Sequence, residues 1–115
     1  MRRGDIRLVD LEPSRGSEAN KTRPCLIVSN DDANRAASRL GRGVVTVVPL
    51  TSSVQRVYPF QVLLPCASTG LPRDSKAQAE QVRAVDAQRV GVQVGDLDFV
   101  RMAAVDDALR HHLGL

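Results

Sequence analysis

The chain has 115 residues, of which 43% are hydrophobic and 25% are charged, a balance typical of one globular domain. No apolar run approaches the length of a membrane span, and no apolar segment of a signal peptide follows the charged start Met1–Asp5. We therefore expect residues 1–115 to form a single domain in the cytoplasm, away from membranes. The two cysteines suggest neither a disulfide framework nor a metal site, so we expect no metal and no cofactor.

The net charge is +3 and the isoelectric point is about 9.4, which permits an anionic partner such as nucleic acid without requiring one. The 16 basic residues are nearly all arginine, which favours two-pronged contacts to phosphate or carboxylate groups. Aromatic residues make up only 3% of the chain, and this scarcity argues against a surface on which bases stack.

Residues Asp5–Leu11 alternate between apolar and polar side chains and predict a short strand. A polar loop over 12–22 follows, and its length is typical of functional or disordered loops. The run from Cys25 to Val28 then predicts a strand buried on both faces. Pro24 lacks an N–H and is expected at the first position of this strand, where it holds Arg23 in extended backbone at the rim of a sheet.

Asn30 or Asp31 is expected to cap a short helix that runs to Leu40 and ends at Gly41. Two further strands are then predicted, over Val44–Val48 and Tyr58–Leu64. Pro49 indicates an edge or a bulge near the end of the first of them. The hydroxyl cluster Thr51–Ser53 follows at once.

The segment Ser75–Val85 alternates like a strand, but the alternation slips at Glu80–Gln81, where a β-bulge would re-aim both polar side chains. The passage Asp86–Gly95 is rich in turn formers. From Asp96 the pattern becomes helical, with one broad apolar face and a stop at Gly114. The pattern as a whole predicts a small, strongly bent antiparallel sheet or partial barrel with a C-terminal helix lying across it.

Arg23 and Thr51 are both expected at strand ends, and if their strands pair, the two side chains face one groove. A fixed guanidinium and a nearby hydroxyl can then hold a phosphate and stabilise charge that develops on it. The alternative is a solvated arginine and a simple hydroxyl turn. Glu18 and Glu80 are candidate general bases, with ordinary surface carboxylates as the alternative.

No single segment identifies a family, but an ordered set of segments does. The set consists of Arg3–Ile6, Val9–Leu11, Gly16–Glu18, Arg23–Asn30, Val47–Ser52, Lys76–Arg83, Asp106–Leu109 and Leu113–Leu115. Together they resemble the MazF/PemK toxins of bacterial toxin–antitoxin pairs, over essentially the whole chain. The resemblance implies a small SH3-like antiparallel β-barrel of the MazF/CcdB/PemK type with a C-terminal α-helix, assembled as a homodimer.

The implied activity is that of a sequence-specific, metal-independent endoribonuclease that cleaves single-stranded RNA and thereby inhibits translation and growth. Messenger RNA is the implied substrate, with ribosomal and transfer RNA as further candidates. Attack by the ribose 2′-OH would leave a 2′,3′-cyclic phosphate and a 5′-OH. A cognate antitoxin would neutralise the toxin by threading an acidic tail through the same groove.

By the same resemblance, the catalytic pair falls on Arg23 and Thr51. Glu18 would help to shape the site, Gln81 would contact RNA with Glu80 beside it, and Ser52 follows the catalytic threonine. One alternative is a gyrase-poisoning toxin of the same fold, but such relatives carry a tryptophan near the chain end and this chain has none. The other is an RNA-binding module without catalysis, against which the presence of both Arg23 and Thr51 argues.

Overall fold

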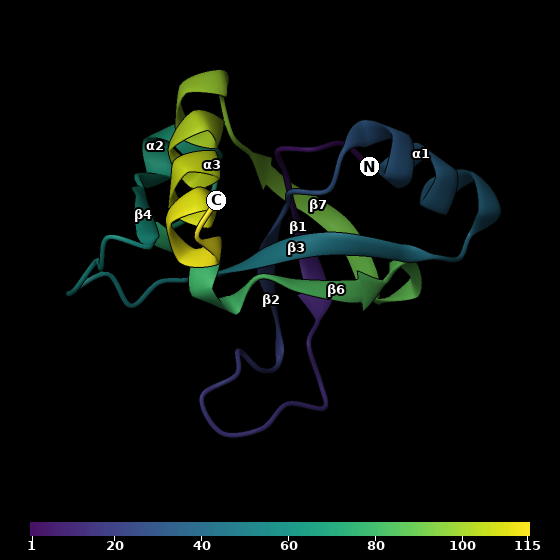
Figure 1. Ribbon diagram of the computed structural model, residues 1–115, viewed down its shortest axis with the longest axis horizontal. Coiled ribbons are helices and arrows are strands. Elements are labelled where there is room, and N and C mark those ends of the chain that lie inside the picture. Colours follow the sequence, from purple (N-terminus) through teal and green to yellow (C-terminus); the bar gives the residue numbers. More distant parts are fainter.

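The computed structural model describes residues 1–115. Its elements, in chain order, are β1 (Asp5–Asp10), β2 (Thr22–Ile27), α1 (Asp31–Leu40), β3 (Val44–Thr51), β4 (Gln61–Leu64), α2 (Cys66–Thr69), β5 (Ser75–Gln78), the 3-10 helix η1 (Ala79–Gln81), β6 (Arg83–Asp86), the 3-10 helix η2 (Ala87–Arg89), β7 (Val90–Asp96) and α3 (Phe99–Leu113). Figure 1 shows α3 next to β4 and α2, whereas α1 lies at the other end of the sheet.

Strand β3 is the centre of the sheet, because it pairs antiparallel with three other strands. It pairs with β6 along Val44–Val47, with β2 along Val47–Pro49, and with β5 at Leu50–Thr51. The strands follow the order β4-β5-β3-β2-β1-β7, with β6 added on β3. The antiparallel sheet with a C-terminal helix is therefore confirmed. No pairing joins β4 to β7, so closure into a full barrel stays a prediction.

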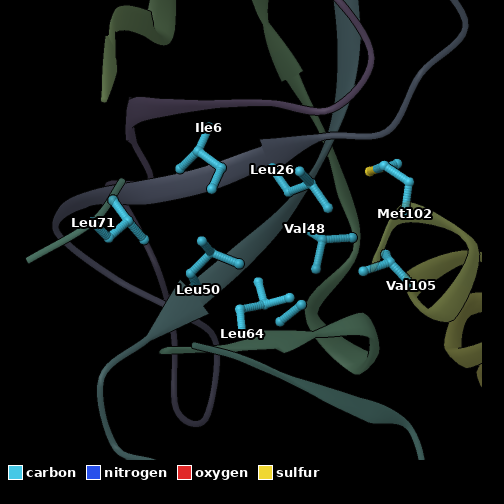
Figure 2. Packing of buried hydrophobic residues seen from close by; sticks show 9 residues of the cluster. Ile6, Leu26, Val48, Leu50, Leu64, Leu71, Met102 and Val105 are labelled. Carbon is cyan, nitrogen blue, oxygen red and sulfur yellow. The ribbon is translucent and has the colours of Figure 1, made fainter. Parts of the chain in front are cut away.

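The buried side chains form two apolar clusters of nine residues each. The first lies between the sheet and α3, and Figure 2 shows Met102 and Val105 of the helix beside Val48 of β3, with Leu50 and Leu64 further along the same cluster. The second cluster holds α1 against the other end of the sheet through Ala37. All of these core residues are aliphatic or sulfur-containing, as the composition indicates.

The buried face of α3 is narrower than its sequence predicts. The helix buries Met102, Val105 and Ala108, whereas Phe99 and Val100 keep 89% and 73% of their surface exposed. The reason is that α3 packs along a single stripe, mainly against β4 and η1. None of the helices combines the length and the hydrophobicity that crossing a membrane requires.

Helix α1 begins and ends as predicted. The Asn30 side chain accepts a hydrogen bond from the N–H of Ala33 at 2.8 Å, and Gly41 ends the helix in the left-handed region at φ 65°. Both features are the expected ones, because short polar side chains satisfy the free N–H groups of a first turn and glycine adopts positive φ without strain.

Four predictions about the strands are wrong in detail. Pro49 marks neither an edge nor a bulge, because it lies inside the central strand β3 opposite Cys25. Pro24 lies inside β2 rather than at its start, which is tolerated because pairing with β3 begins only at the next residue. The slip at Glu80–Gln81 is the 3-10 helix η1 and not a β-bulge. The passage predicted as turns contains strand β7. Its glycines and glutamine give a weak strand pattern in the sequence, and hydrogen bonding to β1 stabilises the strand instead.

The two cysteines differ in environment, and this difference yields the first prediction. Cys25 is fully buried, and burial raises the pKa of its thiol to about 12, although the nearby Arg23 and Arg83 cations oppose this shift. Because only the thiolate reacts, Cys25 stays inert in the folded protein below that pKa. At pH 8 we expect iodoacetamide to modify Cys66, which is half-buried, much faster than Cys25, and to modify both in denaturant. Peptide mass spectrometry measures both rates, and equal rates in the native protein would contradict the packing of β2.

Candidate active site at the ends of β2 and β3

A pocket of about 440 Å³ opens where β2 begins and β3 ends. Its wall consists of Lys21, Thr22, Arg23, Pro24, Leu50, Thr51, Ser52, Leu71, Pro72, Arg73 and Ser75. The strand order β5-β3-β2 places Thr51 on the middle strand, with Arg23 on one flank and the segment that leads into β5 on the other. The pairing of β2 with β3 thus brings together the two residues that the sequence placed at strand ends.

Arg23 is held in place by the loop that precedes it. Its Nε donates to the backbone oxygen of Asn20 at 2.8 Å, and its Nη2 donates to the Asn20 side-chain oxygen at 3.1 Å. The Nη1 group has no partner in the protein, so this end of the guanidinium remains available to a ligand. A guanidinium fixed along one edge in this way loses little further freedom when it binds a phosphate.

Thr51 lies at the end of β3 with its hydroxyl oriented by a local turn. Its Oγ1 accepts a hydrogen bond from the backbone N–H of Ser53 at 3.2 Å. Since a hydroxyl both accepts and donates, its proton is still free to donate to a ligand oxygen. Ser52 also lines the pocket, and its exposed side chain has no hydrogen-bond partner.

Lys21 adds a second cation beside Arg23. Its backbone adopts φ 65°, an uncommon conformation for a residue with a side chain. Two hydrogen bonds hold it there: its N–H donates to Glu12 Oε1 at 2.7 Å, and its carbonyl accepts from the N–H of Leu11 at 3.0 Å. Arg73 is the third cation, and no Asp or Glu lines the pocket, so the wall carries uncompensated positive charge.

Gln81 and Glu18 belong to a different contact. The Gln81 side chain donates through Nε2 to the Ser17 carbonyl at 2.8 Å and accepts through Oε1 from the Ala19 N–H at 3.0 Å. Gln81 therefore anchors the loop over 11–21, which extends from the bottom of the molecule in Figure 1. Glu18 is exposed on this loop, between the two anchored residues, and does not line the pocket.

Glu80 points toward β4 rather than toward the pocket. Its Oε2 accepts a hydrogen bond from Gln61 Nε2 at 2.7 Å, while its Oε1 is buried without a partner. The structure thus gathers Arg23, Thr51 and Ser52 in one pocket, and leaves Glu18, Glu80 and Gln81 outside its wall. No group of three or more His, Cys, Asp and Glu side chains is placed to hold a metal ion.

Two charged residues of the pocket wall, Lys21 and Arg73, are not predicted from the sequence. Lys21 could have been predicted, because it is a basic residue only two positions before Arg23, at the end of the same polar loop. Arg73 could not, because it reaches the pocket only through the pairing of β3 with β5, where Thr51 lies opposite Lys76. In chemical terms, the pocket offers a fixed guanidinium, a hydroxyl donor and two further cations, a set suited to an anion that gains charge during a reaction.

Comparison with known proteins agrees with this chemistry. The family model described as PemK-like, MazF-like toxin of type II toxin–antitoxin systems matches residues 2–113. The endoribonuclease MazF9 of Mycobacterium tuberculosis is 56% identical over 115 residues, covering 100% of this chain and 98% of its own length. The endoribonuclease EndoA of Bacillus subtilis is 34% identical over 116 residues, covering 100% of this chain and 96% of its own.

Among solved structures, a mycobacterial endoribonuclease in complex with its cognate antitoxin superposes with a TM-score of 0.78 at 25% identity, covering 100% of this chain and 96% of that one. The family model extends over nearly the full chain, and two relatives exceed 30% identity along the whole of it. The chain therefore belongs to the PemK-like, MazF-like toxins of type II toxin–antitoxin systems.

Proposed function

We propose that this protein is a cytoplasmic toxin that cleaves single-stranded RNA at a short sequence without a metal ion, and that a cognate antitoxin neutralises it. Family membership supports the proposal, and so does the description of its relatives as endoribonucleases. The observation that carries it is the joint presence of the Arg23 guanidinium and the Thr51 hydroxyl in one positively charged pocket.

In the proposed reaction, the ribose 2′-oxygen attacks the neighbouring phosphorus. A new oxygen–phosphorus bond closes the 2′,3′-cyclic phosphate, and the bond from phosphorus to the 5′-oxygen breaks. Negative charge grows on the non-bridging oxygens, where the free N–H groups of Arg23 and the Thr51 hydroxyl donate hydrogen bonds. Such fixed donors accelerate a reaction because they bind the charge more strongly in the transition state than in the substrate.

Two protons must move in this reaction: one leaves the 2′-OH for a base, and one passes from the Arg23 guanidinium to the 5′-oxygen as its bond to phosphorus breaks. Both groups regain their starting protonation states by exchange with water. Glu18 is the carboxylate we assign as base, and it reaches the pocket only when the loop over 11–21 moves. Because Gln81 anchors that loop, Gln81 contacts RNA only after it releases Ser17 and Ala19. Ser52 adds a second hydroxyl at the mouth of the pocket, and Glu80 borders the path of the RNA from η1.

We also propose that the protein is a homodimer. Apolar side chains are left uncovered on one copy: besides Phe99 and Val100 on α3, Val92 on β7 keeps 64% of its surface exposed. Exposed apolar side chains of this size favour contact with another protein surface, and a second copy of the chain supplies one.

The first test is to incubate the purified protein with a long mixed-sequence RNA in excess EDTA and to map the ends of the products. We expect cuts at one recurring short motif, with 2′,3′-cyclic phosphate and 5′-OH ends, because the attacking group is the 2′-OH. Cleavage that appears only after magnesium is restored would contradict the metal-independent mechanism. Binding without any cleavage would favour the binding module instead.

The second test concerns Arg23. In the Arg23→Ala variant we expect the cleavage rate to fall by about 10³-fold or more, because a charge-stabilising arginine is lost from phosphoryl chemistry. Circular dichroism and thermal unfolding should match the wild type, since the guanidinium bonds only to Asn20. The matched control is Arg42→Ala, which removes an exposed arginine far from the pocket and should leave the rate unchanged. An unfolded Arg23→Ala variant would show that the residue is structural.

The third test isolates the hydroxyl of Thr51. The Thr51→Val variant keeps the branched shape and removes the donor, so we expect kcat to fall by about 10²-fold with little change in KM. Thr51→Ser should retain most of the activity. The matched control is Thr46→Val on the same strand but outside the pocket, which should cleave at the wild-type rate. A loss that appears in KM alone would mean that Thr51 binds RNA without assisting the reaction.

A further inference from the structure

Arg73 lies on the wall of the pocket opposite Arg23 and has no assigned role. It precedes β5, while Arg23 belongs to β2, and β3 runs between these two strands. Thr51 at the end of β3 pairs with Lys76 of β5, three residues after Arg73. Arg73 therefore lines the pocket from beyond the paired end of β5, on the other side of β3 from Arg23. The pocket therefore presents two guanidinium groups at separate places along a groove rather than at one point.

The charge of Arg73 has no partner within the protein. Its side chain makes no hydrogen bond and no ion pair, although an aspartate follows it directly in the sequence. Asp74 is turned away, because its Oδ1 accepts a hydrogen bond from the N–H of Cys66 at 2.9 Å. This bond also lowers the pKa of Asp74, so the carboxylate stays ionised at the start of α2 and leaves Arg73 free.

The loop that carries Arg73 is fixed on both sides. Leu71 is 8% exposed and packs in the first apolar cluster, and its N–H donates to Thr69 Oγ1 at 3.1 Å. Pro72 restricts the next backbone angle, and the bond from Cys66 to Asp74 closes the far end. Figure 2 shows Leu71 turned in toward Ile6 and Leu50. A free cation on such a rigid loop binds an anion without the entropic cost of ordering the loop.

We propose that Arg73 is a positioning residue that binds a phosphate adjacent to the scissile one, while Arg23 and Thr51 act on the scissile phosphate itself. This inference rests on the proposed function. A guanidinium can grip a phosphate with two parallel hydrogen bonds, and a strand held at two successive phosphates is fixed in register across Thr51. Because the neighbouring phosphate keeps its charge throughout the reaction, Arg73 contributes equally to substrate and transition state, and its loss raises KM without lowering kcat.

The test compares Arg73→Gln with Arg42→Gln, an equal change of charge at an exposed site outside the pocket. The ligand is an oligonucleotide with the mapped cleavage motif and a 2′-deoxy sugar at the cut, so that binding is measured without cleavage. We expect Arg73→Gln to weaken binding roughly tenfold at low salt. The plot of log affinity against log salt should become less steep by about 0.7, the value for one phosphate contact on a single strand. Arg42→Gln should match the wild type in both.

A second measurement uses oligonucleotides in which one phosphate at a time is replaced by a neutral methylphosphonate. We expect one linkage next to the scissile position to matter for the wild type and not for Arg73→Gln, whereas the scissile linkage matters for both. A merely structural role for Arg73 would weaken binding at every linkage alike, and that result would overturn the inference.

The two proposals fail in different ways. A wild-type protein that cuts the parent RNA, together with an Arg73→Gln variant of unchanged affinity and salt slope, would overturn the role of Arg73 and leave the proposed function intact. A wild-type protein that does not cut RNA would overturn the proposed function. In that case the same two variants and a mixed-sequence RNA would still decide whether Arg73 binds phosphate.

Discussion

The backbone hydrogen bonds of β3 are the constraint on which the rest of the structure depends. Within eight residues this strand pairs with β6, β2 and β5 in turn, so the sheet has to bend around it. Its alternate side chains supply both apolar clusters, Val48 and Leu50 to one and Val45 and Val47 to the other. The same strand ends at Thr51, between β2, which carries Arg23, and the segment with Arg73 that leads into β5. Core and pocket therefore share one element, and the position of the hydroxyl is as rigid as the core.

The loop over 11–21 is held by hydrogen bonds at its base and at its middle. At its base, Glu12 and Leu11 hold the backbone of Lys21 at positive φ, while Gln81 binds the middle of the loop. Gln81 lies in η1, immediately after β5, so the loop is anchored to the same strand that follows Arg73. Release of the two Gln81 bonds consequently frees the middle of the loop, whereas its base, where Asn20 holds the Arg23 guanidinium, stays bound next to β2.

Local signals in the sequence were enough for some elements and for part of the site. The capping residues predict helix α1, and the positions of Arg23 and Thr51 at the ends of apolar strand runs make them a candidate pair. Strand β7 escaped prediction, since its glycines carry no strand propensity and its stability comes from pairing with β1. Arg73 could not be predicted as a pocket residue for a related reason, because only the long-range pairing of β3 with β5 brings its segment to the end of β3. Strand order cannot be deduced from local patterns, and it brings the segment over 71–75 to the pocket wall.

The charge of the pocket explains its attraction to anions but not its choice among them. Lys21, Arg23 and Arg73 repel one another across a wall without carboxylates, and solvent screens this repulsion only in part, so any polyanion relieves it. An RNA strand and the acidic tail proposed for an antitoxin would both satisfy this requirement. They differ at Thr51, where a phosphodiester with a neighbouring 2′-OH can react and a carboxylate cannot. Under the proposed function, charge therefore governs occupancy of the pocket, and the geometry of the Arg23 guanidinium and the Thr51 hydroxyl governs which occupant is cleaved.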